Sequence, residues 1–242
     1  MQPNLSTQLT TLRKAALIAG LGLLVMVLTV PFAELSILPG LINHSDAQET
    51  FHNIRAHPLL FKLAFMLYFI TFFMDVIVAW ALYVFLKPVN ANFSLLTAWM
   101  RIVYTVIALA ATLNLVNVMV LTGSNAYLQE FGDTLPAMVL TQMRYFGWQW
   151  SFSFFFFSTY LLMLGYLVYK ASYIPKIMAV FLFLSGIGYL LDTLGFFFFP
   201  GVDLSLLMIT FLGELVFMVW LLVKGWRVQE VAELDKNAEG QS

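Results

Sequence analysis

The hydrophobic positions of this chain lie in long unbroken runs that short polar segments separate. A run of about 18 or more apolar residues is typical of a membrane-spanning α-helix, because about 20 helical residues cross the hydrocarbon core. The pattern predicts an all-α, polytopic membrane bundle of six helices in residues 1–228, followed by a polar tail in residues 229–242. The predicted spans cover residues 15–38, 59–87, 93–121, 140–169, 176–199 and 204–223.

The connections between the runs differ in length. The turns at 88–92 and 170–175 are short, so the helices that each of them joins are expected to be antiparallel neighbours. The polar segments at 41–58 and 122–136 are longer. The first of them predicts a short amphipathic helix, with Ser45 as its N-terminal cap and Glu49 near its first turn.

The composition agrees with a membrane environment. Hydrophobic residues make up 61% of the chain and charged residues 10%, whereas a soluble domain carries about 25% charged residues. A net charge of −1 does not indicate nucleic-acid binding. The chain has no Cys, which excludes disulfides and thiolate metal sites.

The first run follows Arg13 and Lys14, as the apolar core of a secretory signal peptide would. Its length, and the poor cleavage context at residues 30–34, favour a retained first span.

The distribution of Lys and Arg near the span ends predicts the orientation, because cytoplasmic loops of membrane proteins are enriched in these residues. One side of the predicted bundle carries eight cations and the other carries three. The eight are Arg13, Lys14, Lys87, Lys170, Lys176, Lys224, Arg227 and Lys236; the three are Arg55, Lys62 and Arg144. Both termini are therefore expected in the cytoplasm, with the chain in the cell (inner) membrane.

Four predicted spans contain a charged residue: Asp75, Arg101, Asp192 and Glu214. A charge near the middle of a bilayer costs at least about 2.5–3.5 kcal/mol, so such residues usually face the bundle interior and pair. Asp75 lies twelve residues before Lys87, and Arg101 lies eight residues after the start of the next span. At about 1.5 Å per residue their depths differ by only about 6 Å, which predicts an ion pair between adjacent helices. Asp192 and Glu214 have no evident cationic partner.

Asn114 and Asn117 complete the candidate intramembrane polar site. They lie about 140–160° around the helix from Arg101. One neighbouring helix cannot supply polar partners to both faces, so the helix at 93–121 is expected to be central. Two interpretations remain open. The polar residues either form structural hydrogen bonds between helices or line a cavity for a substrate, an ion or a proton.

Other chemistries have weaker support. All three His residues lie in the first polar segment. If that segment is helical, Glu49 and His52 share a helix face and form a weak candidate for a metal site. Their spacing matches no standard metal-binding motif. No His falls in a predicted span, which disfavours bis-His haem, and no cofactor is expected. No standard hydrolase, protease or nucleotide-binding motif occurs.

Two spans end with a Tyr-x-x-x-Lys pair, Tyr83 with Lys87 and Tyr166 with Lys170. Aromatic and cationic residues at span ends are typical of interface anchors. A duplicated helical hairpin is the alternative explanation.

Residues 164–180, Leu-Gly-Tyr-Leu-Val-Tyr-Lys-Ala-Ser-Tyr-Ile-Pro-Lys-Ile-Met-Ala-Val, and the continuation to Asp192 resemble a bacterial membrane-protein family described as domain of unknown function 4386. Residues 82–90, Leu-Tyr-Val-Phe-Leu-Lys-Pro-Val-Asn, and Arg101 also resemble that family, over most of the chain. Family members often place a Glu near this Arg and a His in the fourth span, where this chain has Tyr104 and no His. The resemblance implies a bacterial multi-pass membrane protein and no particular activity.

We therefore expect an integral membrane protein without catalytic activity, with an accessory, sensor or structural role. A small transporter or permease that uses the buried charges is the alternative, and a membrane-embedded enzyme is the third. The transporter hypothesis predicts that Asp75, Arg101, Asp192 and Glu214 converge on one cavity that solvent reaches. The lipid bilayer is the expected partner, a small-molecule or ion ligand is compatible with the sequence, and the oligomeric state is not defined by it.

Overall fold

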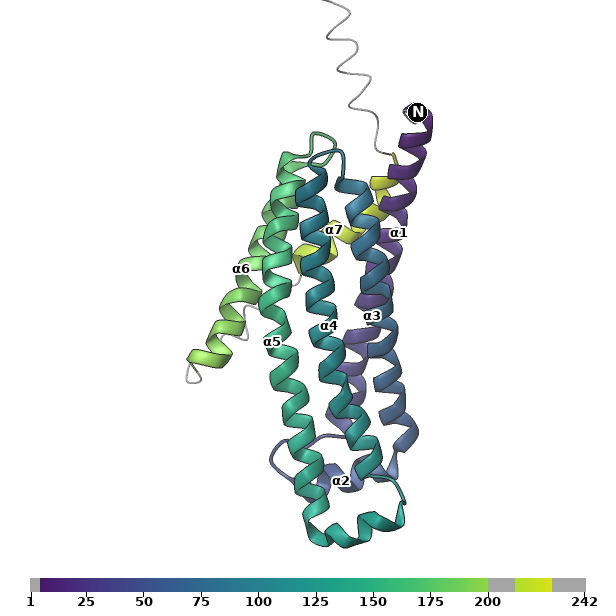
Figure 1. Cartoon of the computed structure of the whole chain (residues 1–242), viewed down its shortest axis with the longest axis vertical. Helices are drawn as coiled ribbons and strands as arrows, with labels where there is room; N and C mark the ends of the chain where they lie inside the picture. Colours follow the sequence, from purple (N-terminus) through teal and green to yellow (C-terminus); the bar gives the residue numbers. More distant parts are fainter. Residues whose placement is uncertain (1–4, 200–211, 228–242) are drawn as a thin grey trace, which may run out of the picture. The chain divides into compact units, whose positions relative to one another are not determined.

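The structure is a computed structural model that describes residues 5–199 and 212–227, and no strand occurs among them (Figure 1). The order of elements is α1 (Leu5–Phe32), the π-helical η1 (Ala33–Ile37), the 3-10 helix η2 (Leu38–Gly40), α2 (Ala47–Ala56), α3 (Pro58–Leu86), α4 (Ala91–Leu121), the 3-10 helix η3 (Ala126–Thr134), α5 (Leu135–Lys170), α6 (Lys176–Phe198), α7 (Leu212–Val223) and the 3-10 turn η5 (Gly225–Arg227). The predicted all-α fold class is confirmed.

Five helical segments of the described residues are long and apolar enough to cross a membrane. They are Thr11–Gly40, Pro58–Leu86, Ala91–Leu121, Ala126–Lys170 and Lys176–Phe198, and each overlaps one of the first five predicted spans. The predicted sixth span, 204–223, begins outside the described residues. Its described part, α7, has 12 residues, fewer than a crossing needs.

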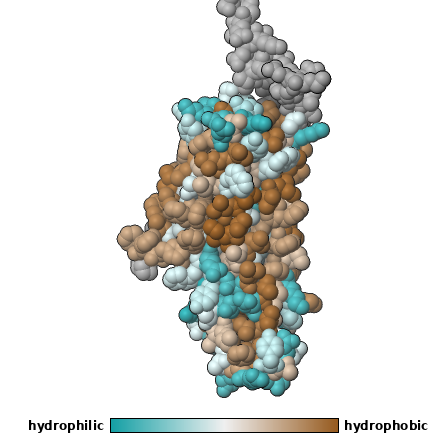
Figure 2. All heavy atoms as spheres, viewed as in Figure 1, coloured by the Kyte–Doolittle hydropathy of each residue, from teal (hydrophilic) through white to brown (hydrophobic). Residues whose placement is uncertain are grey.

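The outward-facing side chains of these helices are largely apolar. Phe73, Val106 and Leu113 are 62%, 58% and 61% exposed. Figure 2 shows that hydrophobic side chains make up much of the visible surface. A soluble monomer rarely exposes an apolar surface of this extent, whereas lipid tails solvate it without cost. The surface therefore agrees with a multi-pass membrane protein.

The described residues form two compact units. Unit 1 contains residues 5–24, 75–103, 154–199 and 212–227, and unit 2 contains residues 25–74 and 104–153. Helices α1, α3, α4 and α5 contribute residues to both units, whereas α6 and α7 belong to unit 1 and α2 to unit 2.

Close backbone contacts hold the helices of unit 1 together. A Cβ atom at Gly213 of α7 would lie 2.2 Å from the backbone oxygen of Phe181 in α6, so only glycine fits there. A Cβ at Gly186 of α6 would lie 2.8 Å from the Leu162 side chain of α5. Small residues at helix contacts let membrane helices approach and gain dispersion energy, which lipid would otherwise supply.

The predicted amphipathic helix of the first polar segment is present in unit 2 as α2. Its cap is Asp46 and not Ser45, because the backbone N–H of Glu49 donates to Asp46 Oδ1 at 3.0 Å. The helix begins at Ala47, and a capping side chain reaches the N–H group two or three residues ahead. The Ser45 N–H donates instead to Asn43 Oδ1 at 3.0 Å.

Two helices begin five or more residues before the predicted spans. Helix α1 starts at Leu5, ten residues before the predicted 15, and α5 starts at Leu135, five residues before the predicted 140. The predicted limits follow hydropathy, whereas a helix continues into polar sequence as long as its backbone bonds are satisfied. Pro136 is tolerated because the first N–H groups of a helix have no intrahelical partner.

Candidate functional site

The side chain of Arg101, on α4 in unit 1, is fully buried. Its Nε donates to Asp75 Oδ1 of α3 at 2.8 Å, and its Nη2 lies 2.7 Å from the same oxygen. Asp75 is also fully buried. The predicted Asp75–Arg101 ion pair is therefore present, and it compensates two charges that would otherwise be very costly away from water.

The remaining nitrogen of the guanidinium, Nη1, has two further partners. It donates to Tyr160 Oη of α5 at 2.6 Å and to Glu214 Oε1 of α7 at 2.8 Å. The prediction that Glu214 lacks a cation is therefore wrong. We call Asp75, Arg101, Tyr160 and Glu214 the Arg101 network, and it joins four helices of unit 1.

Aromatic rings cover the cation on the α5 side. The Cζ atom of Arg101 lies 4.8 Å from the ring centre of Tyr160 and 6.0 Å from that of Phe157. The two rings are three residues apart on α5 and therefore share a helix face. The negative faces of the rings stabilise the guanidinium where water is absent.

The Arg101 network contains two carboxyl groups and one guanidinium. With all three ionised, the network carries one uncompensated negative charge. Asp75 Oδ2 is buried and has no hydrogen-bond partner within the part of the chain that the structure describes. Of the three charged residues, only Glu214 has solvent-accessible side-chain surface, and its side chain is 18% exposed. The Arg101 network therefore has a surplus of negative charge, and Glu214 is its most accessible group.

Asp192 does not belong to the Arg101 network. It is half-buried on α6, and its side chain makes no hydrogen bond or ion pair among the described residues. The four predicted charges therefore do not converge: three of them meet, and Asp192 lies apart.

Asn114 and Asn117 lie in unit 2, where each pairs with an amide of α5. Asn114 Nδ2 donates to Gln149 Oε1 at 2.8 Å, and Asn117 Nδ2 donates to Gln142 Oε1 at 3.1 Å. Amide pairs of this kind are typical hydrogen bonds between membrane helices. The α4 helix thus uses separate stretches of its length for the ion network and for the amide pairs.

The predicted polar site does not include three residues that make polar contacts in the interior. Tyr160 is one, and the other two are Glu34 and Tyr68 of unit 2, whose hydroxyl donates to the Glu34 carboxylate. Tyr68 is fully buried, and its ring contacts Phe146 and Trp150 edge-on at 5.4 and 5.3 Å. A signal for Tyr68 exists, because it lies seven residues before Asp75 and so on the same face of α3.

The weak metal candidate, Glu49 with His52, stays a prediction. Both residues lie on α2, and Glu49 Oε2 accepts a hydrogen bond from Asn43 Nδ2 at 2.6 Å. Within the described ranges no three His, Asp or Glu side chains are grouped as a metal site requires.

Comparison with known proteins identifies the family. A family model described as Domain of unknown function (DUF4386) matches residues 18–225, a range that contains the whole Arg101 network. An uncharacterized protein of Archaeoglobus fulgidus is 34% identical over 163 residues, which are 67% of this chain and 84% of that protein. No solved structure matches this chain. With five membrane-spanning candidates and a family match over most of its length, the chain belongs to the DUF4386 family of multi-pass membrane proteins.

Proposed function

We propose that this protein is a non-catalytic integral membrane protein, with an accessory, sensor or structural role, in which the Arg101 network holds α3, α4, α5 and α7 in register. The main observation behind this proposal is that Nε, Nη1 and Nη2 of Arg101 each contact side chains of the same chain. A fully buried guanidinium whose three nitrogens all contact side chains of the chain itself is poorly placed to bind a substrate. The site is closed, as a structural contact between helices requires.

The energetics of burial support this role. Each charge of the Arg101 network lost its hydration, so the network stabilises the bundle only while its members remain together. Removing the cation leaves Asp75 and Glu214 uncompensated next to each other. Loss of one partner from a buried ion pair costs about 3–5 kcal/mol.

The substitution Arg101→Met tests the structural role. It is expected to lower the free energy of unfolding by about 3–5 kcal/mol, because the buried Asp75 and the partly buried Glu214 lose their counter-charge. The matched control is Arg144→Met, which changes an exposed arginine of α5 whose Nη2 donates to the His44 carbonyl at 3.3 Å. The control is expected within about 0.5 kcal/mol of the wild type. Thermal and denaturant unfolding in one detergent measure both, and equal losses for the two variants would contradict the structural role.

A small proton-linked transporter is the second candidate. The surplus negative charge of the Arg101 network and the unpaired Asp75 Oδ2 favour it, since both suit a site that binds and releases one proton. The partial exposure of Glu214 supplies the contact with the surroundings that such a site needs. Two observations argue against a transporter. Asp75 and Arg101 are completely buried, and Asp192 lies outside the Arg101 network.

A proton-flux assay separates the two candidates. Protein reconstituted in liposomes with a trapped pH-sensitive dye is expected to collapse a pH gradient no faster than protein-free liposomes. The transporter candidate expects flux that Glu214→Gln abolishes and that Asp192→Asn leaves unchanged. Wild-type flux with that pattern would overturn the non-catalytic proposal, whereas flux equally insensitive to both variants would exclude the Arg101 network as its path.

For the membrane topology we propose six spans, with the sixth at residues 204–223. We also propose that the chain lies in the cell (inner) membrane with both termini in the cytoplasm. The excess of eight cations over three supports this orientation. Lys87, Lys170 and Lys176 belong to the group of eight, and they flank the two short turns of unit 1.

Single-cysteine labelling tests the topology, because the chain contains no cysteine of its own. Ser124 and Ser172 are both exposed, one in the second polar segment and one in the α5–α6 turn. A membrane-impermeant maleimide is expected to label Ser124→Cys on intact spheroplasts, and Ser172→Cys only after the membrane is opened. The reverse pattern would show the opposite orientation.

A further inference from the structure

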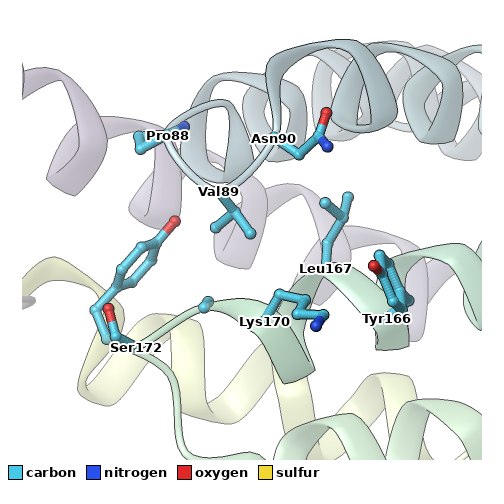
Figure 3. Close-up of a pocket in the computed structure, with 9 residues that line it drawn as sticks. Pro88, Val89, Asn90, Tyr166, Leu167, Lys170 and Ser172 are labelled. Atoms are coloured by element: carbon cyan, nitrogen blue, oxygen red, sulfur yellow. The ribbon is translucent and has the colours of Figure 1, made fainter.

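Unit 1 contains a cavity of about 430 Å³ between the α3–α4 turn and the α5–α6 turn, which we call the turn pocket. Its wall consists of residues 88–90 from the first turn and residues 166–167 and 170–173 from the end of α5 and the second turn. Figure 3 shows Val89 pointing from the first turn into this space, with Leu167, Lys170 and Tyr166 on the α5 side. The Arg101 network contributes no residue to the wall.

The wall combines apolar and polar groups. Val89, Leu167 and Ala171 provide apolar surface, while Asn90, Lys170 and Ser172 provide hydrogen-bonding groups. Pockets with a mainly apolar lining and a few polar groups are typical of ligand sites. This mixture suits a ligand with a polar head and apolar substituents.

The charge of the two turns selects an anion. Residues 87–92 and 170–176 contain three lysines, Lys87, Lys170 and Lys176, and no acidic residue. Only Lys170 lines the turn pocket; its Nζ lies 5.7 Å from the Tyr166 ring centre, and the side chain is exposed. Asn90, which precedes α4, also lines the pocket, and its Oδ1 accepts from the Phe93 N–H at 2.9 Å.

The turn pocket is preformed by contacts between its walls. Tyr173 Oη donates to the Phe85 carbonyl of α3 at 2.7 Å, and the two rings meet edge-on at 5.4 Å. Burial raises the pKa of Tyr173, so this hydroxyl stays protonated and continues to donate. The rings of Phe93 and Tyr166 contact each other at 5.2 Å and join the start of α4 to the end of α5. A pocket held from both sides keeps its shape before a ligand arrives, which lowers the entropic cost of binding.

We propose that the turn pocket binds the headgroup of an anionic phospholipid, with the phosphate next to Lys170 and the glycerol and first acyl carbons against Val89 and Leu167. The pocket lies where α3 and α5, two of the candidate spans, end, and there a lipid phosphate meets the protein surface. Basic pockets between membrane helices are known sites for acidic headgroups. This site is separate from the Arg101 network and does not depend on the proposed function.

The chain offers a matched pair of variants for the test. Lys87 and Lys170 both end a span, both are exposed, and each lies over the ring of the tyrosine four residues earlier, at 5.9 and 5.7 Å. Lys87 does not line the turn pocket. Lys87→Gln and Lys170→Gln therefore remove the same charge from the same end of unit 1, and only Lys170→Gln removes a pocket contact.

Native mass spectrometry of the detergent-solubilised full chain measures lipid binding with phosphatidylglycerol, and phosphatidylcholine serves as the neutral reference. Wild type is expected to prefer phosphatidylglycerol, and Lys170→Gln is expected to bind it about tenfold or more weakly. Lys87→Gln is expected to lose less than about fivefold in affinity, which is the contribution of one lysine near a membrane surface. Tyr173→Phe, which removes the Phe85 hydrogen bond and no charge, is expected to weaken the same binding.

Three outcomes would overturn the proposal. Equal losses for Lys170→Gln and Lys87→Gln would mean attraction to surface charge and no pocket. Equal binding of the two lipids by wild type would mean no headgroup selection. Displacement of phosphatidylglycerol by millimolar inorganic phosphate would mean that the ligand is the free anion. Unfolding temperatures of all variants are measured alongside, so that a loss of binding is counted only for a folded chain.

Discussion

The burial of one guanidinium is the constraint on which the described part of unit 1 depends. Arg101 cannot lose its charge under ordinary conditions, and a lone cation inside a membrane protein is very costly. The chain meets this cost with acceptors from three other helices, Asp75 on α3, Tyr160 on α5 and Glu214 on α7. Apolar packing between membrane helices has no comparable preference for one rotation or depth, so we infer that these directional bonds set the register of the four helices.

Close packing in unit 1 agrees with this role. The tight approach at Gly213 brings α7 against α6, and the next residue along α7 is Glu214, which bonds to Arg101. A longer side chain at position 213 would push α7 away and lengthen that ion pair. In unit 2 the same helix α4 relies on neutral amide pairs, Asn114 with Gln149 and Asn117 with Gln142, which carry no such charge penalty. The two units therefore use different polar chemistry along shared helices.

Much of the fold follows from hydropathy alone, because lipid requires long apolar runs and the chain has them. The Asp75–Arg101 pair was also predictable, since a short turn and a fixed rise per residue set the depths of both residues. Glu214 was not, because its partner lies 113 residues earlier in the sequence and no short connection relates α7 to α4. Tyr160 lies among ten tyrosines that no pattern distinguishes. The Asp46 cap was missed by one residue, because Ser45 and Asp46 are equally good caps and only the helix start decides between them.

The most direct measurement of the central claim is a double-mutant cycle between Arg101 and Glu214, with unfolding free energies for Arg101→Met, Glu214→Leu and the double variant. If the two side chains form the buried contact described above, removing Glu214 relieves part of the damage that Arg101→Met causes. The double variant is then less destabilised than the sum of the single variants, by about 0.5–3 kcal/mol. Additivity within about 0.3 kcal/mol would contradict the account, because it would mean that the two residues do not interact.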